Sequence, residues 1–129
     1  ERTLRLITPL TPGGAADLLT RMMAEALQAR LGRPIVMENR PGGGGFIGMG
    51  EVARAAPDGY TFGMGNTAAN AILPAISRVP PPFDPVAGFT PVVLVAFAPS
   101  VLVVNAERIA ARNLADLIAH IRARTGQLN

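Results

Sequence analysis

The chain has 129 residues, of which 49% are hydrophobic and 16% are charged, and its formal net charge at pH 7 is +3. This composition is too apolar and too weakly charged for a disordered chain, and the length suits a single folded domain. The sequence contains no cysteine, which excludes disulfides, thiol catalysis and thiolate metal sites. No apolar run approaches the ~18–20 residues that span a bilayer, so we expect no membrane-embedded segment.

The basic residues argue against nucleic acid as a partner. All 12 are arginine, and they are scattered along the chain rather than gathered in one segment. A nucleic-acid-binding surface combines clustered basic residues with aromatic ones, but aromatic residues make up only 5% of this sequence. We therefore expect no nucleic-acid partner.

The first signals along the chain are a strand and a helix. Residues 3–8 predict a strand, which Pro9 breaks. Residues 15–31 predict a helix, because apolar residues recur there at steps of three and four. Gly32 and Pro34 supply the stop signals that end it. Its apolar face is expected to comprise Leu18, Leu19, Met22, Met23, Ala26, Leu27 and Leu31.

The next segment repeats this alternation. A short buried strand is predicted over residues 35–38, and a glycine-rich loop follows it. A second helix is predicted over 46–56, although each of its two internal glycines should weaken it by about 1 kcal/mol. A third strand is predicted over 60–64, and the chain then enters a short helix that ends near Pro74.

The last third of the chain begins with a proline-rich connection over residues 79–91. A fourth strand is predicted over 92–97, and 101–104 forms a separate apolar run. Asn113 is the expected N-cap of a final helix, with an acidic residue in its first turn. The inner face of that helix is expected to comprise Leu114, Leu117, Ile118 and Ile121.

Alternation of apolar strands with helices favours an α/β fold with a mostly parallel, doubly wound sheet and helices on both sides. In such sheets, ligands bind beyond the carboxyl ends of the strands, at the loops that enter helices. Three loops rich in glycine or small residues occupy that position: 11–17, 40–46 and 65–68. Because a helix N-terminus presents unpaired N–H groups, three such termini together predict a site for anions, most simply carboxylates.

Two of these features also have plainer interpretations. Gly13 and Gly14 can form a tight turn and nothing more. Asp17 can simply cap or charge the first turn of its helix. If Asp17 serves the site instead, it would do so by accepting hydrogen bonds from loop amides or from a ligand ammonium group, since a carboxylate does not attract an anion.

Gly43, Gly45 and Gly48 match the G-x-G-x-x-G spacing of dinucleotide-binding loops. Four consecutive glycines produce such spacing easily by chance, and no acidic residue follows at the distance that the motif requires. Catalysis finds little support, because His120 is the single histidine and the chain has no lysine and no G-x-S-x-G motif. The nine acidic residues are dispersed, so no metal site and no cofactor are predicted.

Four stretches match a known family in the same order along the chain. The first is Leu4-Arg5-Leu6-Ile7-Thr8-Pro9 with Gly13, Gly14 and Asp17, and the second is Glu38-Asn39-Arg40-Pro41 with Gly42–Gly45, Ile47 and Gly48. The third is Ala55-Ala56-Pro57-Asp58-Gly59-Tyr60-Thr61 with Met64 and Gly65. The fourth is Phe89-Thr90-Pro91-Val92 with Val101-Leu102-Val103-Val104-Asn105. This sequence resembles the Bug-type (TctC-like) extracytoplasmic solute receptors, which are the substrate-binding components associated with tripartite tricarboxylate transporters. The C-terminal stretch 125–129 resembles a segment early in the second domain of that family.

The resemblance implies a type II periplasmic binding protein whose two lobes close on a ligand. Residues 1–100 would form the first ligand-binding lobe, 101–105 an inter-lobe crossover strand and 106–129 the start of a truncated second lobe. It further implies a non-enzymatic, periplasmic protein, after removal of a leader not present in this chain. Such a protein would capture a small organic acid (di- or tricarboxylic, amino or aromatic) and pass it to membrane transporter components.

The ligand-binding residues that the resemblance implies lie in the first and third loops: Leu10, Thr11, Gly13, Gly14, Ala15, Asp17, Gly65, Asn66, Thr67 and Ala68. Several positions depart from the family pattern: Leu10 for phenylalanine, Ala15-Ala16 for Gly-Thr or Gly-Ser, Phe46 for asparagine, Ala69 for threonine and Ser100 for asparagine. These departures predict a less polar pocket and an acid with some apolar or aromatic body. Two other function classes stay open: a Rossmann-like nucleotide-binding enzyme fragment that uses residues 43–48, and an interaction module whose glycine loops are only turns.

Overall fold

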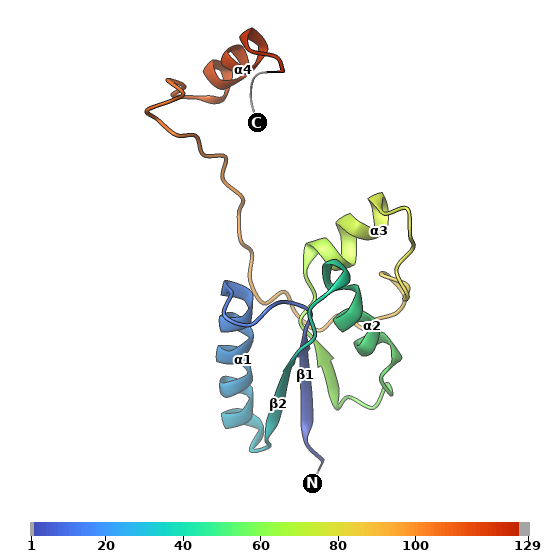
Figure 1. Ribbon diagram of the computed structural model, residues 1–129. Helices are drawn as coiled ribbons and strands as arrows, with labels where there is room; N and C mark the ends of the chain where they lie inside the picture. Colours follow the sequence, from blue (N-terminus) through green and yellow to red (C-terminus); the bar gives the residue numbers. More distant parts are fainter. Residues whose placement is uncertain (1, 127–129) are drawn as a thin grey trace. The chain divides into compact units, whose positions relative to one another are not determined.

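The computed structural model describes residues 2–126 of the chain, which divides into two compact units, Glu1–Pro91 and Val92–Asn129. The first unit carries most of the regular structure (Figure 1). Its elements are β1 (Leu4–Thr8), α1 (Ala15–Leu31), β2 (Ile35–Asn39), the 3-10 turn η1 (Gly43–Gly45), α2 (Phe46–Arg54), β3 (Thr61–Gly63), the π-helical turn η2 (Ala68–Ile72) and α3 (Leu73–Ile76). This order of strands and helices confirms the prediction for the first unit.

The sheet of the first unit has three parallel strands in the order β2-β1-β3. In register, Thr8 of β1 lies beside Asn39 of β2, and Ile7 lies beside Gly63 of β3. Because all three strands run the same way, their carboxyl ends meet at one edge of the sheet. The loops that follow the three strands therefore begin at that edge (Figure 1).

The central strand β1 is covered on both faces. Side chains alternate along a strand, so Arg5 and Thr8 point to opposite sides of the sheet. Arg5 reaches Glu51 of α2, whereas Asn39, the neighbour of Thr8, reaches Asp17 of α1. Helices α1 and α2 therefore pack on opposite faces, and the predicted α/β architecture is confirmed (Figure 1).

The expected apolar face of α1 is only partly buried, which corrects the sequence interpretation. Leu18 and Met22 are each 60% exposed, whereas the buried residues of α1 are Asp17, Thr20 and Ala24. These three residues share the adjacent face of the helix, since they lie three and four positions apart. Small side chains at the contact allow α1 to lie close to the sheet, whereas Leu19 and Met23 are only half-buried.

The proline-rich segment 79–91 packs on α2 through aromatic rings. Phe83 makes edge-to-face contacts with Phe46 at 5.8 Å and with Phe89 at 5.3 Å between ring centroids. Asp84 accepts hydrogen bonds from the amides of Val86 and Ala87, each at 2.8 Å, and these bonds lower the pKa of its carboxyl. The segment is thus a connection with its own internal hydrogen bonds, as expected of a loop of this length.

The second unit contains α4 (Leu114–Ala123), which begins as predicted. Asn113 caps the helix by accepting a hydrogen bond from the amide of Asp116 at 2.9 Å. Of the four residues expected on its inner face, Leu117 is buried and the other three are exposed.

The fourth strand predicted over residues 92–97 is wrong. The segment is extended, but among the described residues it joins no β-ladder, and Val92 and Leu94 are 79% and 80% exposed. The run 101–104 is likewise extended and unpaired. An apolar run becomes a strand only when it hydrogen-bonds to a partner strand. The division into a first lobe, a crossover and a second lobe stays a prediction.

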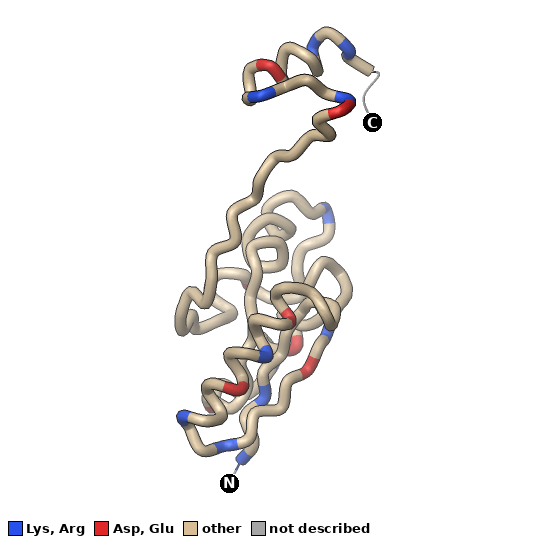
Figure 2. Tube along the Cα trace, turned by 90° about the vertical axis from the view of Figure 1, so that its left-hand side faces the viewer, with Lys and Arg blue, Asp and Glu red and all other residues tan. Residues whose placement is uncertain are grey.

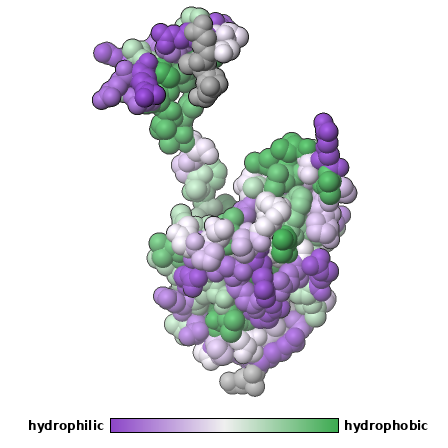
Figure 3. All heavy atoms as spheres, viewed as in Figure 1, coloured by the Kyte–Doolittle hydropathy of each residue, from purple (hydrophilic) through white to green (hydrophobic). Residues whose placement is uncertain are grey.

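The trace in Figure 2 shows both basic and acidic positions in the first unit, with several basic ones near the N-terminus. Apolar side chains are exposed at several places, among them Ile72 and Ile76 at α3 (Figure 3). None of the described helices is long and apolar enough to cross a membrane.

Candidate functional site

The loops after β1, β2 and β3 meet at the carboxyl edge of the sheet. A Cβ atom built on Gly45, in the second loop, would lie 3.4 Å from the Cβ atom of Pro9, which precedes the first loop, and 3.7 Å from Nδ2 of Asn66 in the third loop. The same atom would lie 2.7 Å from the Cβ atom of Ala69, just beyond the third loop. The predicted convergence of the three glycine-bearing loops is therefore confirmed.

Glycines in and after the second loop allow other parts of the chain, rather than a ligand, to approach closely. Gly45 has a φ of 105°, a left-handed conformation that disfavours any residue with a Cβ. A Cβ on Gly48 would lie 2.8 Å from the carbonyl oxygen of Arg40 and 2.9 Å from the Cα atom of Pro9. Two glycines of the G-x-G-x-x-G match, Gly45 and Gly48, thus allow close packing between loops.

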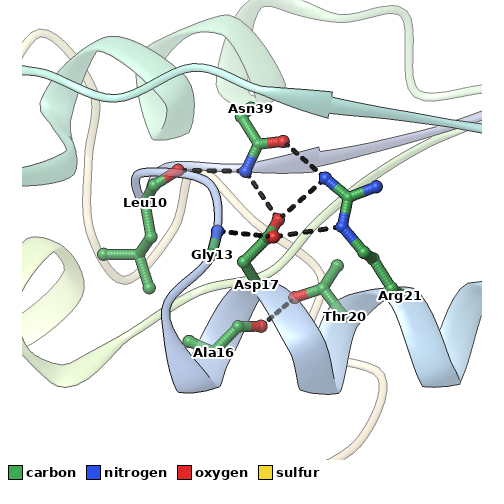
Figure 4. A network of polar contacts seen from close by, with 7 residues as sticks. All are labelled: Leu10, Gly13, Ala16, Asp17, Thr20, Arg21 and Asn39. Carbon is green, nitrogen blue, oxygen red and sulfur yellow. Dashed lines mark hydrogen bonds and ion pairs between the residues drawn. The ribbon is translucent and has the colours of Figure 1, made fainter.

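The first loop is held by Asp17, whose side chain is buried (Figure 4). Its Oδ2 atom accepts hydrogen bonds from the amide of Gly13 at 2.9 Å and from Nε of Arg21 at 3.0 Å. Its Oδ1 atom accepts from Nδ2 of Asn39 at 2.8 Å. These bonds, with that from Gly13 the strongest, lower the pKa of Asp17 to about 2.

Both carboxylate oxygens of Asp17 are thus occupied by donors of the chain itself. Asp17 accepts a hydrogen bond from the amide of the loop residue Gly13, and its charge lies in the first turn of α1. The structure gives Asp17 no free oxygen directed at a ligand.

The N-terminus of α1 is open at the carboxyl edge of the sheet. Gly14 occupies the N-cap position, and no side chain caps the helix there. The first amides of a helix have no partner within it, and they carry a partial positive charge. Thr11, Gly13, Gly14 and Ala15 are all exposed at this end, so the predicted residues of the first loop do gather around it.

Asn66 is the central polar residue of the third loop. Its Oδ1 atom accepts a hydrogen bond from the backbone amide of Ala69 at 2.8 Å. The backbone amide of Asn66 donates to Oδ1 of Asn70 at 3.2 Å. Its Nδ2 group is buried and has no partner within the part of the chain that the structure describes. Buried donors are rarely left unpaired in proteins, so this group is the one buried side-chain donor of the described third loop that a ligand acceptor could satisfy. Its neighbours Gly65, Thr67 and Ala68 are exposed.

Two positions expected to make the pocket less polar are explained by packing instead. The ring of Phe46 contacts Phe83, and Ala69 is completely buried where Gly45 approaches it. Leu10 is half-buried; its carbonyl accepts from Nδ2 of Asn39 at 3.1 Å, and its side chain points away from that amide (Figure 4).

The sequence did not predict which side chains outside the three loops hydrogen-bond to them. The sequence places Asn39 only within a family motif, and its register beside Thr8 is the feature that brings it next to α1. Four charged residues form a second link between β1, β2 and α2, with N–O distances of 2.6 to 3.3 Å: Arg5, Glu38, Arg40 and Glu51. The pKa of Glu38 is lowered, first by its hydrogen bond with Arg5. Charges that look dispersed in the sequence are paired in the fold.

Hollows of the surface lie elsewhere. One of about 350 Å³ is lined by residues of the second unit, including Leu102 and Leu117, and one of about 170 Å³ lies between α1 and β2 at Arg21 and Met37. Within residues 2–126, no three carboxylate or imidazole side chains gather as metal ligands would.

The sequence matches that of a receptor family. The model of the tripartite tricarboxylate transporter family receptor (TctC) matches residues 19–129. A UPF0065 protein of Bordetella pertussis is 36% identical over 100% of this chain, and Protein BugT of the same organism is 37% identical over 98%. The chain covers 39% of the length of each of these relatives.

Solved structures give the same result. A protein from R. palustris with adipate superposes with a TM-score of 0.79 at 35% identity, over 95% of this chain and 40% of that one. MatC from Rhodopseudomonas palustris with bound malate gives 0.73 at 27% identity, over 98% and 42%. The periplasmic binding protein BugD gives 0.63 at 35% identity, over 69% and 29%. This chain therefore belongs to the tripartite tricarboxylate transporter receptor (TctC) family, and it covers one lobe of the periplasmic binding protein fold.

Proposed function

We propose that this chain is the first ligand-binding lobe of a periplasmic receptor that captures a small carboxylate for a tripartite tricarboxylate-type transporter. The observation that carries the proposal is the meeting of three loops at the carboxyl edge of the sheet, beside the open N-terminus of α1. Membership of the TctC family supports it, as do the adipate and malate of two structural relatives.

The chemistry of the edge suits a carboxylate. The free amides at the start of α1 and the unpaired Nδ2 group of Asn66 are hydrogen-bond donors, and a hydrogen bond to a charged group contributes about 1.5–3 kcal/mol. The helix N-terminus favours negative charge by a further ~0.3–1 kcal/mol. These are groups that bind and release an acid reversibly, and the proposal gives them no catalytic role and no cofactor.

The body of the acid is expected to be partly apolar. With Phe46 and Ala69 assigned to packing, this expectation rests on Leu10 and Ala15, where the family has an aromatic ring and a glycine followed by a hydroxyl-bearing residue. An acid with a methylene chain or an aromatic ring is favoured over one that carries a polar group on every carbon.

Calorimetric titration of the complete protein with adipate, malate, citrate, benzoate and NAD tests the proposal. We expect saturable binding of at least one acid with an apolar body, and loss of that binding for its dimethyl or methyl ester. Binding of citrate alone would contradict the apolar part of the proposal. Binding of NAD without any acid would contradict the receptor itself.

A further inference from the structure

Asn39 links the end of β2 to the first loop through every polar atom of its side chain (Figure 4). Its Nδ2 group donates to the carbonyl of Leu10 at 3.1 Å and to Oδ1 of Asp17 at 2.8 Å. Its Oδ1 atom accepts from Nη2 of Arg21 at 3.3 Å. No hydrogen of this amide is left for a ligand, so Asn39 acts on other residues of the fold.

The first loop has little else to hold it. In the described chain, the hydrogen bonds of residues 10–13 end on two side chains: the carbonyl of Leu10 meets Asn39, and the amide of Gly13 meets Asp17. Gly13 has a φ of 84° and nothing within 4 Å of a Cβ built on it, so packing does not impose its conformation. The loop conformation therefore depends on these polar contacts.

Arg21 completes the arrangement electrostatically. Its Nε and Nη2 atoms lie 3.0 and 3.3 Å from the two oxygens of Asp17. An unpaired carboxylate in the first turn of α1 would repel an anion bound at that helix end. The guanidinium offsets this charge, so Asp17 can hold the loop without opposing the ligand.

We propose that Asn39, Asp17 and Arg21 are positioning residues that hold the first loop in its ligand-binding conformation before the ligand arrives. The inference rests on the proposed function, and it gives Asp17 a positioning role in place of the ligand contact that the resemblance implies. If only a fraction of molecules has the loop in place, the apparent Kd rises in inverse proportion to that fraction.

This role has a kinetic signature that a ligand contact lacks. Loss of a positioning residue lowers the population that can bind, so the association rate falls while the dissociation rate of the bound complex is nearly unchanged. Loss of a direct contact raises the dissociation rate instead.

The test compares Asp17→Asn and Asn39→Ala with the control Asp58→Asn in the complete protein. Asp17→Asn keeps the volume but leaves at least one donor facing an amide NH₂ group and Arg21 without its carboxylate. Asp58 is matched in chemistry, because it also accepts from a backbone amide, that of Tyr60 at 3.0 Å, and pairs with an arginine, Arg2. It precedes β3 and so lies at the opposite edge of the sheet.

Two measurements are made on each variant: hydrogen exchange of the Gly13 amide by NMR, and stopped-flow kinetics with the tightest-binding acid. We expect exchange at Gly13 to quicken by about tenfold or more in both variants, and by a larger factor than exchange in β1. We expect Kd to rise about tenfold through the association rate, and the control to match the wild type in both measurements.

Unchanged exchange at Gly13, or a Kd raised through the dissociation rate, would overturn the inference. A control that loses affinity to the same extent would overturn it as well, by making the effect one of general stability. If the wild-type protein binds no acid, the proposed function fails, and exchange at Gly13 still decides whether the three residues hold the loop.

Discussion

The two polar atoms of the Asn66 side chain, Oδ1 and Nδ2, have different roles, and one substitution can test them separately. Its Oδ1 atom is bound to the amide of Ala69, whereas its buried Nδ2 group has no partner among the described residues. Asn66→Asp retains an acceptor for Ala69 and replaces the free donor by a negatively charged oxygen. If Nδ2 donates to a carboxylate ligand, calorimetry on the complete protein should show Kd raised by about tenfold to 100-fold. The unfolding midpoint should also fall, because the substitution buries an unpaired charge.

Asn70→Asp is the matched control, because it retains an acceptor for the amide of Asn66 and adds the same charge one helical turn further along. An equal loss of affinity in both variants would show that added charge, rather than the lost donor, is responsible.

Asp17 gives a prediction for acid conditions. Its pKa is lowered to about 2, so the ionised carboxylate stabilises the folded state. That contribution is complete above the unfolded-state pKa of about 3.9 and is lost as the pH falls through the folded-state value. The difference in unfolding midpoint between the wild type and Asp17→Asn should therefore be constant above about pH 5 and shrink as the pH approaches 2. Scanning calorimetry measures it, and a difference that persists undiminished at the lowest pH would show that the carboxylate's charge is not the cause.

Among the elements, the loop between β2 and α2 shows how backbone conformation and packing combine. Gly45→Ala would place a methyl group at a φ of 105° and 2.7 Å from the Cβ atom of Ala69. The left-handed conformation costs about 1–2 kcal/mol and overpacking about 1–3 kcal/mol, so we expect a loss of about 2–5 kcal/mol in the free energy of unfolding.

Gly59→Ala isolates the conformational cost. Gly59 also has a positive φ, of 76°, but nothing lies within 4 Å of a Cβ built there. Urea unfolding of the complete protein should show that Gly59→Ala loses only about 1–2 kcal/mol. If the two substitutions cost the same, the contact between Gly45 and Ala69 contributes nothing.

The elements also show which parts of the fold are readable from the sequence. β1, α1 and the cap of α4 follow local rules, namely apolar periodicity, glycine and proline stops, and an asparagine N-cap. The buried face of α1 differs from the predicted one. The helical spacing fits two adjacent faces of α1, and the prediction took the more hydrophobic one, with Leu18, whereas the structure buries the one with Thr20. The strand predicted over 92–97 is absent because pairing depends on a partner that local sequence does not reveal.

The candidate site divides in the same way. The convergence of three loops follows from strand order alone, so glycine and strand patterns predict it. The bond between Asn39 and Asp17 joins residues 22 positions apart in the sequence, and it depends on the register of β2 beside β1. The sequence suggests Phe46 as part of the pocket. Its contact with Phe83 could not be foreseen, because that contact depends on the path of segment 79–91. Long-range register and loop paths are not encoded in any local pattern.

For the molecule as a whole, the balance of buried and exposed apolar surface leads to a prediction about residues 1–129 produced by themselves. The chain covers 39% of the length of two relatives, so a complete receptor of that length provides further surfaces for it to contact. Apolar residues lie exposed in both units, among them Leu18, Ile76 and Val92. Exposed apolar surface of this kind drives association in water.

The segment 1–129 should therefore associate in a concentration-dependent way in sedimentation velocity, whereas the complete protein should not, if its remaining chain covers the same residues. Leu18→Glu combined with Met22→Glu provides the control, because both positions are exposed on α1 and turn away from the sheet. This double variant should weaken association of the segment while leaving its helix content by circular dichroism unchanged. A segment that stays monomeric at all concentrations would show that this exposed apolar surface does not drive association, and would contradict the prediction.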